Sequence, residues 1–325
     1  MMGNVISLDG QWELCLIENC KLKENLNTIN DLMNREEQTI KATVPGNFEF
    51  DLVNAGLEKD PYVNANIWDF YKYENKHLFY YRTFKTEKNK SFELCFDGVD
   101  TLADVYLNGK LVLSTNNMML EYSVDVEEYL QDFNELVVHI KPVVIESKKS
   151  EYSMRAWQNS LYGACGRTIR KPAHMFGWDI MPRAVSGGIY KSCYLRVKKP
   201  SKIKDVCYVP DKFDYVNRTA KVSFIYNIKI EEDSYSGYEI EITGSCKDSK
   251  FSVSQNIWHT SNVIFQVPIT NCYFWYPKNY GEANLYKVKV VLKKDGLEID
   301  KYSLENVLEI RDLRRVNRRR YGKVH

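Results

Sequence analysis

The amino-acid sequence predicts an all-β protein made of two β-sandwich domains. Short runs in which apolar and polar residues alternate recur along the chain, and each is bounded by Asn, Asp, Gly, Pro or Ser. Alternation with a period of two is typical of strands with one face in a core, and the bounding residues favour turns. The 23 Tyr, 14 Phe and 6 Trp also favour sheets over helices. Because no long helical segments separate the runs, antiparallel sandwiches are expected.

The expected strands are the alternating runs, taken in order along the chain. They are SFELCF (91–96), ADVYLNGKLVL (103–113), ELVVHIKP (135–142), KSCYLRV (191–197), KVSFIYNIKI (221–230), GYEIEITG (237–244), NVIFQVPI (262–269) and LYKVKVVL (285–292). Within the second run, Asn108-Gly109 predicts a tight hairpin, because both residues tolerate positive φ. Residues 26–37 form the one helical stretch of note. They are polar and are expected to make a surface excursion.

A domain boundary is expected near Lys198-Lys199-Pro200. One strand series ends before it, and after it about seven short strands follow, a number that suits an immunoglobulin-like sandwich. We therefore assign residues 1–199 to the first domain and 200–314 to the second. Residues 315–325 form a basic tail or the start of a linker.

Composition excludes several function classes. The formal net charge of +2 gives no overall attraction to nucleic acid or membrane, and no apolar run reaches the ~18 residues of a membrane span. The first residues lack a basic segment followed by an apolar one, so a cytoplasmic location is expected. The 8 Cys include no CxxC pair, and the 5 His are dispersed. Neither a metal nor a cofactor is expected, and the thiols are expected to be reduced and mostly buried.

The longest stretch without obvious strands is residues 144–183. A segment of this length inside a compact domain is usually functional or disordered. Because it carries Trp157, Tyr162, Phe176 and Trp178, it is too apolar for disorder. It is therefore the candidate site.

Several motifs in order resemble glycoside hydrolase family 2, and its β-mannosidase-like members in particular. They are LDGQWEL (8–14), ATVPGNFEFDLVNAGLEKDPY (42–62), FYYRTF (79–84), FDGVDTLADVYLNG (96–109), YSVDVEEYL (122–130), IRKPAHMFGWDIMPRAVSGGIYK (169–191) and FWYPKNYGEANLYKVKV (274–290). The resemblance implies a jelly-roll-like, galactose-binding-like sandwich followed by an immunoglobulin-like one. It also implies a carbohydrate partner, a β-mannoside or related β-linked sugar, and a catalytic barrel as a second partner.

The resemblance assigns Trp178 and Asp179 to the subsite for the terminal sugar. An indole offers an apolar face to a pyranose, and a carboxylate accepts hydrogen bonds from neighbouring hydroxyls. Arg183 would hold the loop by an ion pair or contact the ligand. The alternative is that Trp178 packs the loop and Asp179 caps a turn.

This sequence departs from the family signature WDWGPR at two positions, where it has Ile180 and Met181. Losing the glycine removes easy access to positive φ, so the loop is expected to turn differently. Losing the second indole removes a surface for stacking or packing. Both changes bear on sugar specificity.

No catalytic pair can be assigned in these residues. A retaining glycosidase needs two carboxylates about 5–5.5 Å apart, and the family carries them on a (β/α)8 barrel. No segment alternates strand and helix as such a barrel does. Glu93, Asp97 and the Asn134-Glu135 dipeptide lie in strand-like runs or turns and are interpreted as structural.

Three functions remain open. The chain is a non-catalytic region that supports the barrel of a β-mannosidase-like exo-glycosidase, a free-standing carbohydrate-binding module, or a structural and assembly module. The basic tail would otherwise indicate binding to an anionic surface, but it is better explained as the continuation of the last strand.

Overall fold

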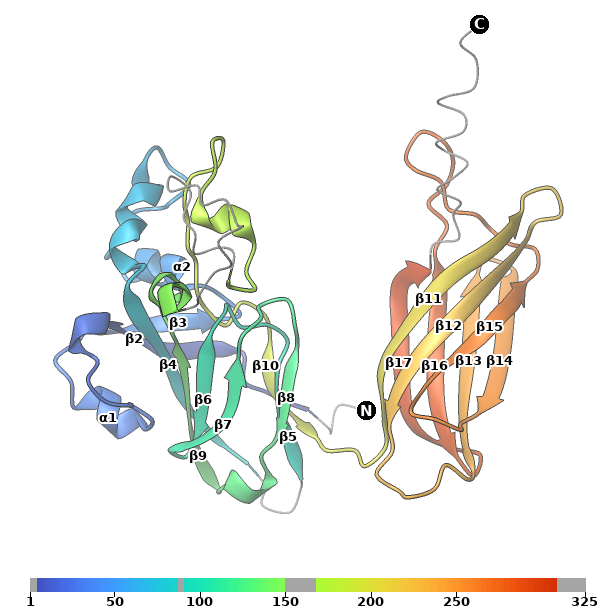
Figure 1. Cartoon of the computed structure of the whole chain (residues 1–325), viewed down its shortest axis with the longest axis horizontal. Coiled ribbons are helices and arrows are strands. Elements are labelled where there is room, and N and C mark those ends of the chain that lie inside the picture. Colours follow the sequence, from blue (N-terminus) through green and yellow to red (C-terminus); the bar gives the residue numbers. More distant parts are fainter. Residues whose placement is uncertain (1–4, 87–90, 150–167, 309–325) are drawn as a thin grey trace, which may run out of the picture. The chain divides into compact units, whose positions relative to one another are not determined.

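The computed structural model describes residues 5–86, 91–149 and 168–308. The chain divides into two compact units, Met1–Lys198 and Lys199–His325. Each unit contains two sheets of antiparallel strands, so the all-β expectation is confirmed (Figure 1). The tail at 315–325, together with Trp157, Tyr162 and Cys165, lies outside the described residues.

The first unit is a sandwich of a six-stranded and a four-stranded sheet. The larger sheet has the order β3-β2-β4-β9-β6-β7, and the smaller has the order β1-β10-β5-β8. The strands are β1 (Val5–Ser7), β2 (Gly10–Glu18), β3 (Thr39–Val44), β4 (Lys76–Lys85), β5 (Phe92–Phe96), β6 (Ala103–Leu107), β7 (Lys110–Thr115), β8 (Tyr122–Asp125), β9 (Phe133–Ile140) and β10 (Cys193–Val197). Their facing side chains, such as Trp12, Phe96 and Val138, form one buried core. The expected hairpin joins β6 to β7, and Asn108 and Gly109 both have positive φ.

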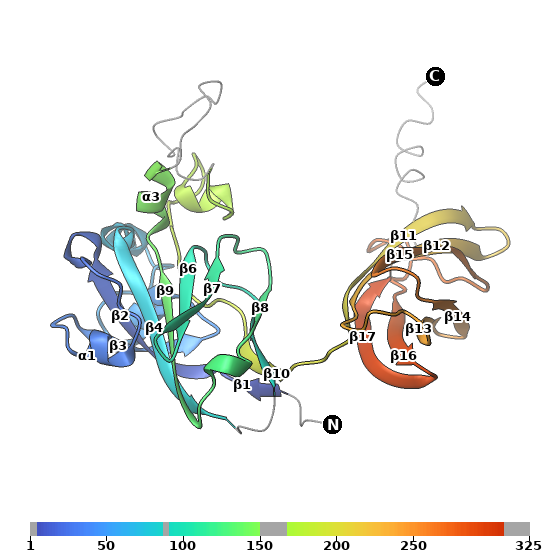
Figure 2. The same cartoon turned by 60° about the horizontal axis from the view of Figure 1, so that its bottom comes forward.

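The region at residues 26–37 is an excursion between β2 and β3 whose residues are mostly exposed or part-exposed, as expected, but it also has a buried side. Only α1 (Ile29–Met33) is α-helical, and it begins at a capping box in which Thr28 and Asp31 exchange hydrogen bonds. Its Ile29 and Leu32 are buried against the outer face of the six-stranded sheet, where Phe79 of β4 is fully covered. Figure 2 shows α1 beside this sheet. The short helix thus buries a second face of β4, whose residues 77–81 are all buried.

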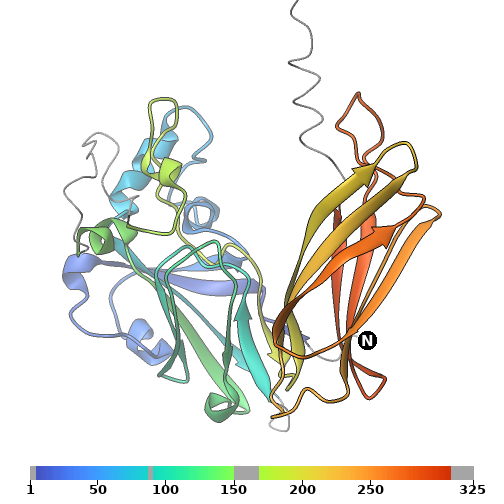
Figure 3. The ribbon, with the colours of Figure 1, turned by 45° about the vertical axis from the view of Figure 1, so that its right-hand side comes forward.

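Most of the remaining helices of the first unit gather at one end of the sandwich (Figure 1, Figure 3). These are α2 (Phe48–Asn54), α3 (Val143–Glu146) and the 3₁₀ segments Asn66–Tyr73, Ser147–Lys149 and Ala173–Phe176. Two further 3₁₀ turns, Asn19–Lys21 and Glu127–Tyr129, lie elsewhere. No helix among the described residues is long and apolar enough to cross a membrane.

The second unit is a seven-stranded sandwich of two sheets (Figure 3). One sheet has the order β11-β12-β15 and the other β14-β13-β16-β17. The strands are β11 (Lys202–Asp214), β12 (Thr219–Lys229), β13 (Tyr238–Cys246), β14 (Ser249–Asn256), β15 (Ser261–Ile269), β16 (Tyr286–Lys294) and β17 (Leu297–Leu308). Phe224, Ile242 and Tyr286 are central to its separate core. Strand β13 alternates strictly between buried and part-exposed residues, as the sequence pattern predicts.

Seven cysteines lie among the described residues, and all are free thiols. Five are buried, whereas Cys20 and Cys207 are exposed. No group of three or more His, Cys, Asp or Glu in the described residues is arranged to hold a metal ion.

Candidate functional site

The candidate site is the loop at residues 176–183, which rises from the end of the first unit where the helices gather. A buried cluster holds its base. Phe176 is 1% exposed and packs with Val143, Val144, Ile169 and Val185. Phe176 therefore anchors the loop to α3, and the residues that follow it turn outward.

A buried ion pair fixes the segment that leads into the loop. The ammonium group of Lys171 is fully buried and donates to both carboxylate oxygens of Asp100. It also donates to the carbonyl oxygen of Ser186 at 2.8 Å, which ties together the two ends of the segment. Burial lowers the pKa of Lys171, and the Asp100 carboxylate opposes that shift. Sequence reasoning missed this pair because its members lie 71 positions apart.

A second ion pair holds the loop itself. The guanidinium group of Arg183 donates from Nε and Nη2 to the two oxygens of Glu74, at 2.6 and 2.7 Å. Its Nη1 donates to the carbonyl oxygen of Phe176 at 3.0 Å. The ion pair that was considered for Arg183 is thus present in the structure.

The tip of the loop is a tight reversal. Trp178 and Met181 exchange backbone hydrogen bonds of 3.1 and 3.2 Å, and Asp179 Oδ1 accepts from the backbone N–H of Ile180 at 2.9 Å. Among residues 176–183, all of which the structure describes, only Gly177 has positive φ. The turn therefore forms without a glycine at position 181, and Met181 is accommodated.

The tip also presents its apolar side chains to solvent. Trp178 is 58% exposed, Ile180 78% and Met181 43%. Asp179 is exposed beside them. Trp178 therefore does not pack the loop internally, whereas Asp179 does make a hydrogen bond within the turn. The indole and the carboxylate are both exposed to a ligand.

Two buried carboxyl groups lie beneath this end of the sandwich. Glu49 Oε2 accepts from the hydroxyl of Ser186 at 2.9 Å, and burial raises the pKa of Glu49 to about 7. Burial likewise raises the pKa of Asp51 to about 6, although Asp51 accepts hydrogen bonds from Thr43 and Tyr80. Asp51 links α2 to β3 and β4, and Glu49 links α2 to Ser186, so both carboxyl groups support the fold.

The other carboxylates considered from the sequence have structural partners. Glu93 pairs with Arg196 at 2.9 Å, and Asp97 accepts from the Tyr194 hydroxyl at 3.1 Å. Asn134 bonds to Gln131 and Thr86 around a turn, and Glu135 accepts from the backbone N–H of Ile29. Each of these four polar residues therefore has a hydrogen-bonding partner in the fold, which accounts for its place in or beside a strand.

Two sequence families match the chain. Residues 28–191 match "Glycosyl hydrolase 2 galactose-binding domain-like", and residues 201–305 match "Glycosyl hydrolases family 2". Among curated proteins, the chain is 25% identical over 264 residues to β-mannosidase B of Aspergillus niger, covering 79% of this chain and 31% of that protein. It is 26% identical over 284 residues to the β-mannosidase of Bos taurus, covering 79% of this chain and 31% of that protein. The chain thus spans about a third of the length of these relatives.

Solved structures resemble both units. The β-D-mannosidase from Dictyoglomus thermophilum is similar with a TM-score of 0.72 and 25% identity, covering 92% of this chain and 36% of that one. A β-glucuronidase from Ruminococcus gnavus is similar with a TM-score of 0.60 and 17% identity, covering 93% of this chain and 44% of that one. The second likeness concerns the fold only.

Proposed function

The chain belongs to glycoside hydrolase family 2, and from this membership we propose that it supplies non-catalytic domains to a β-mannosidase-like exo-glycosidase. The described residues form two β-sandwiches and contain no (β/α)8 barrel. The carboxylate pair that cleaves a β-mannoside would come from a barrel outside these residues. The likeness to β-mannosidases supports the substrate class.

In this function the loop at residues 176–183 contributes to the subsite for the terminal sugar. Trp178 stacks on the apolar face of the pyranose, and Asp179 accepts hydrogen bonds from its hydroxyl groups. The observation that carries the proposal is the exposure of Trp178 beside Asp179 on a loop held by Arg183 and Glu74. A loop fixed by an ion pair loses less conformational freedom when a sugar binds.

The loop's role is tested by titrating the chain with mannose and manno-oligosaccharides while following tryptophan fluorescence. We expect a saturable change that Trp178→Phe and Asp179→Asn remove. Trp68→Phe is the matched control, because Trp68 is 53% exposed but lies outside the loop. A response that survives both loop substitutions would exclude the loop from sugar binding.

The non-catalytic role is tested separately with the pure 325-residue chain and an aryl β-mannoside. Release of the aryl group above the buffer rate would show that the chain carries its own catalytic residues. A free-standing carbohydrate-binding module is the second candidate, and the same exposed indole favours it. Micromolar binding by the chain alone would support this candidate, whereas a subsite completed by a barrel predicts weaker binding.

A further inference from the structure

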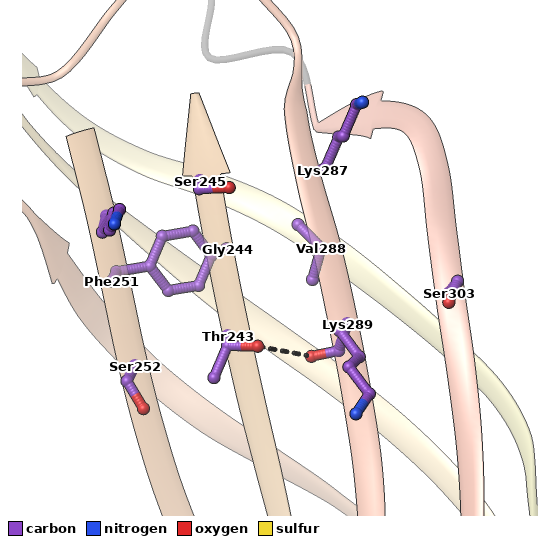
Figure 4. Close-up of a pocket in the computed structure, with 10 residues that line it drawn as sticks. Thr243, Gly244, Ser245, Phe251, Ser252, Lys287, Val288, Lys289 and Ser303 are labelled. Carbon is purple, nitrogen blue, oxygen red and sulfur yellow. Dashed lines mark hydrogen bonds between the residues drawn. The ribbon is translucent and has the colours of Figure 1, made fainter. Parts of the chain in front are cut away.

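The outer face of one sheet in the second unit carries a hollow that the proposed function does not use. Strands β14, β13, β16 and β17 line it, and its volume is about 920 Å³. Its outward-facing residues are three lysines and four hydroxyl residues: Lys250, Lys287, Lys289, Thr243, Ser245, Ser252 and Ser303. Figure 4 labels all of these except Lys250. The hollow exists because short hydroxyl side chains form the floor and long lysines rise around it.

The strand registers place these groups in two rows across the sheet. In the first row, Ser245 lies between Lys250 on β14 and Lys287 on β16. In the second, Thr243 lies between Ser252 and Lys289, and Ser303 follows on β17. Since neighbouring strands are about 4.8 Å apart, Lys250 and Lys287 arise about 10 Å from each other. Lys289 arises about 7 Å along the strand from Lys287.

The hollow is positively charged. No carboxylate is among the residues that line it, and Lys250 and Lys287 make no ion pair with any described residue. Lys289 meets Glu298 at 3.4 Å, a contact in which both side chains are about half exposed and which contributes little. Figure 4 shows Lys287 and Lys289 pointing in opposite directions along β16. Separated ammonium groups of this kind attract an anion whose charges are themselves spaced.

We propose that this hollow binds an acidic polysaccharide, a linear chain of sugars that carry carboxylates. The three lysines arise about 7–10 Å apart on the sheet. Because Lys287 and Lys289 point away from each other, this arrangement suits carboxylates repeated along a chain better than one small oxyanion (Figure 4). The hydroxyl groups between them donate to and accept from sugar hydroxyls. Single-stranded nucleic acid fits less well, because it requires exposed aromatic platforms. Phe251, the one aromatic residue in the lining, is 7% exposed and belongs to the core.

Calorimetric titration of the 325-residue chain with polygalacturonate tests the proposal. The fully methyl-esterified polymer is the matched ligand, since it keeps the backbone and loses the charge. We expect saturable binding to polygalacturonate that weakens as salt is raised and is absent for the ester. Equal binding of both polymers would overturn the proposal, and so would the absence of binding.

Variants locate the binding site. Ser245→Glu places a carboxylate between Lys250 and Lys287 without removing a lysine, and we expect it and Lys250→Gln/Lys287→Gln each to weaken binding about tenfold or more. The control is Lys204→Gln/Lys221→Gln, which removes the same charge from exposed positions on β11 and β12. If both lysine-pair variants weakened binding equally, the effect would come from the net charge of the chain, and the proposed site would be wrong. Single-stranded DNA that binds as tightly as polygalacturonate would overturn the ligand class. Mannose titration is independent of all these outcomes.

Discussion

Arg183 and Glu74 lie 109 positions apart in the sequence and meet through two parallel hydrogen bonds of 2.6 and 2.7 Å. Their side chains are 20% and 13% exposed, so water screens the pair only in part. This contact joins the loop at 176–183 to the segment that follows the 3₁₀ helix Asn66–Tyr73. The position of Trp178 and Asp179 therefore depends on a residue far from the family motif.

Replacing this guanidinium group should loosen the loop. In Arg183→Lys the charge remains but the planar fork is lost, and we expect a loss of about 1–2 kcal/mol in unfolding free energy. Amide hydrogen exchange at residues 177–183 should become faster. Lys149→Gln is the control, because it breaks an exposed pair with Glu146 and should cost less than about 0.5 kcal/mol. If amide hydrogen exchange at residues 177–183 were unchanged in Arg183→Lys, the backbone hydrogen bonds between Trp178 and Met181 would be sufficient to hold the tip.

The buried pair at the base of the loop should be more sensitive. Lys171→Met leaves the Asp100 carboxylate buried without its partner, and we expect a cost of about 3–5 kcal/mol. Asp100→Asn/Lys171→Met should recover part of that loss, because it also removes the stranded charge. Urea denaturation of both variants measures the difference. Equal losses in the single and the double variant would show that the charge itself is unimportant.

The fold could be predicted from the sequence because a sandwich strand with one buried face shows an alternation of apolar and polar residues. β13 follows that pattern fully. β4 does not, because α1 covers its second face, and a local pattern does not reveal what packs against a strand from elsewhere. The expectation of a surface excursion at residues 26–37 missed the buried side of the segment for the same reason. Buried Leu26, Ile29 and Leu32 occupy one side of a segment that is polar on average.

The candidate loop could be located from its motif, but the contacts that hold it could not be predicted. Lys171 and Asp100 each lie in a recognisable motif, yet nothing local indicates that they pair. The expected effect of Met181 depended on where the loop needs positive φ. The structure has that conformation at Gly177, so the glycine missing at 181 is not required for the turn.

The pKa of Glu49 predicts a specific pH dependence of stability. Its folded pKa of about 7 lies above the ordinary value of 4.5, so the folded state holds this proton more tightly. The contribution of Glu49 to the free energy of unfolding is therefore fully present below about pH 4.5 and is lost as the pH rises through 7. Glu49→Gln keeps an acceptor for Ser186 and cannot ionise. We expect it to match the parent near pH 4.5 and to exceed it by about 1–3 kcal/mol at pH 8.

Urea denaturation at both pH values measures this difference. Glu58→Gln is a useful comparison, because Glu58 pairs with exposed Lys72 and accepts from Tyr73. Losing those contacts should lower stability at pH 8, whereas Glu49→Gln should raise it. If Glu49→Gln were destabilising at both pH values, the carboxylate of Glu49 would be ionised and satisfied in the fold.

A buried pair of histidines predicts the opposite trend. His77 Nδ1 lies 2.8 Å from His139 Nε2, and His77 Nε2 lies 3.1 Å from Asn19 Oδ1. Because the amide oxygen accepts from His77, Nδ1 of His77 must in turn accept from His139. Burial lowers the pKa of His77 to about 4 and that of His139 to about 3. A proton on His77 Nδ1 would set two N–H groups against each other.

The unfolded chain gains protons at these histidines near pH 6.5, whereas the folded chain resists them until pH 3–4. Their contribution to stability is therefore present above pH 6.5 and is lost as the pH falls through that window. In His77→Gln/His139→Gln, we expect unfolding free energy to fall less between pH 6.5 and pH 4 than in the parent. Imidazole resonances of the folded parent should also stay in the neutral form at pH 5. Titration of either ring near pH 6.5 in the folded chain would contradict the buried, neutral pair.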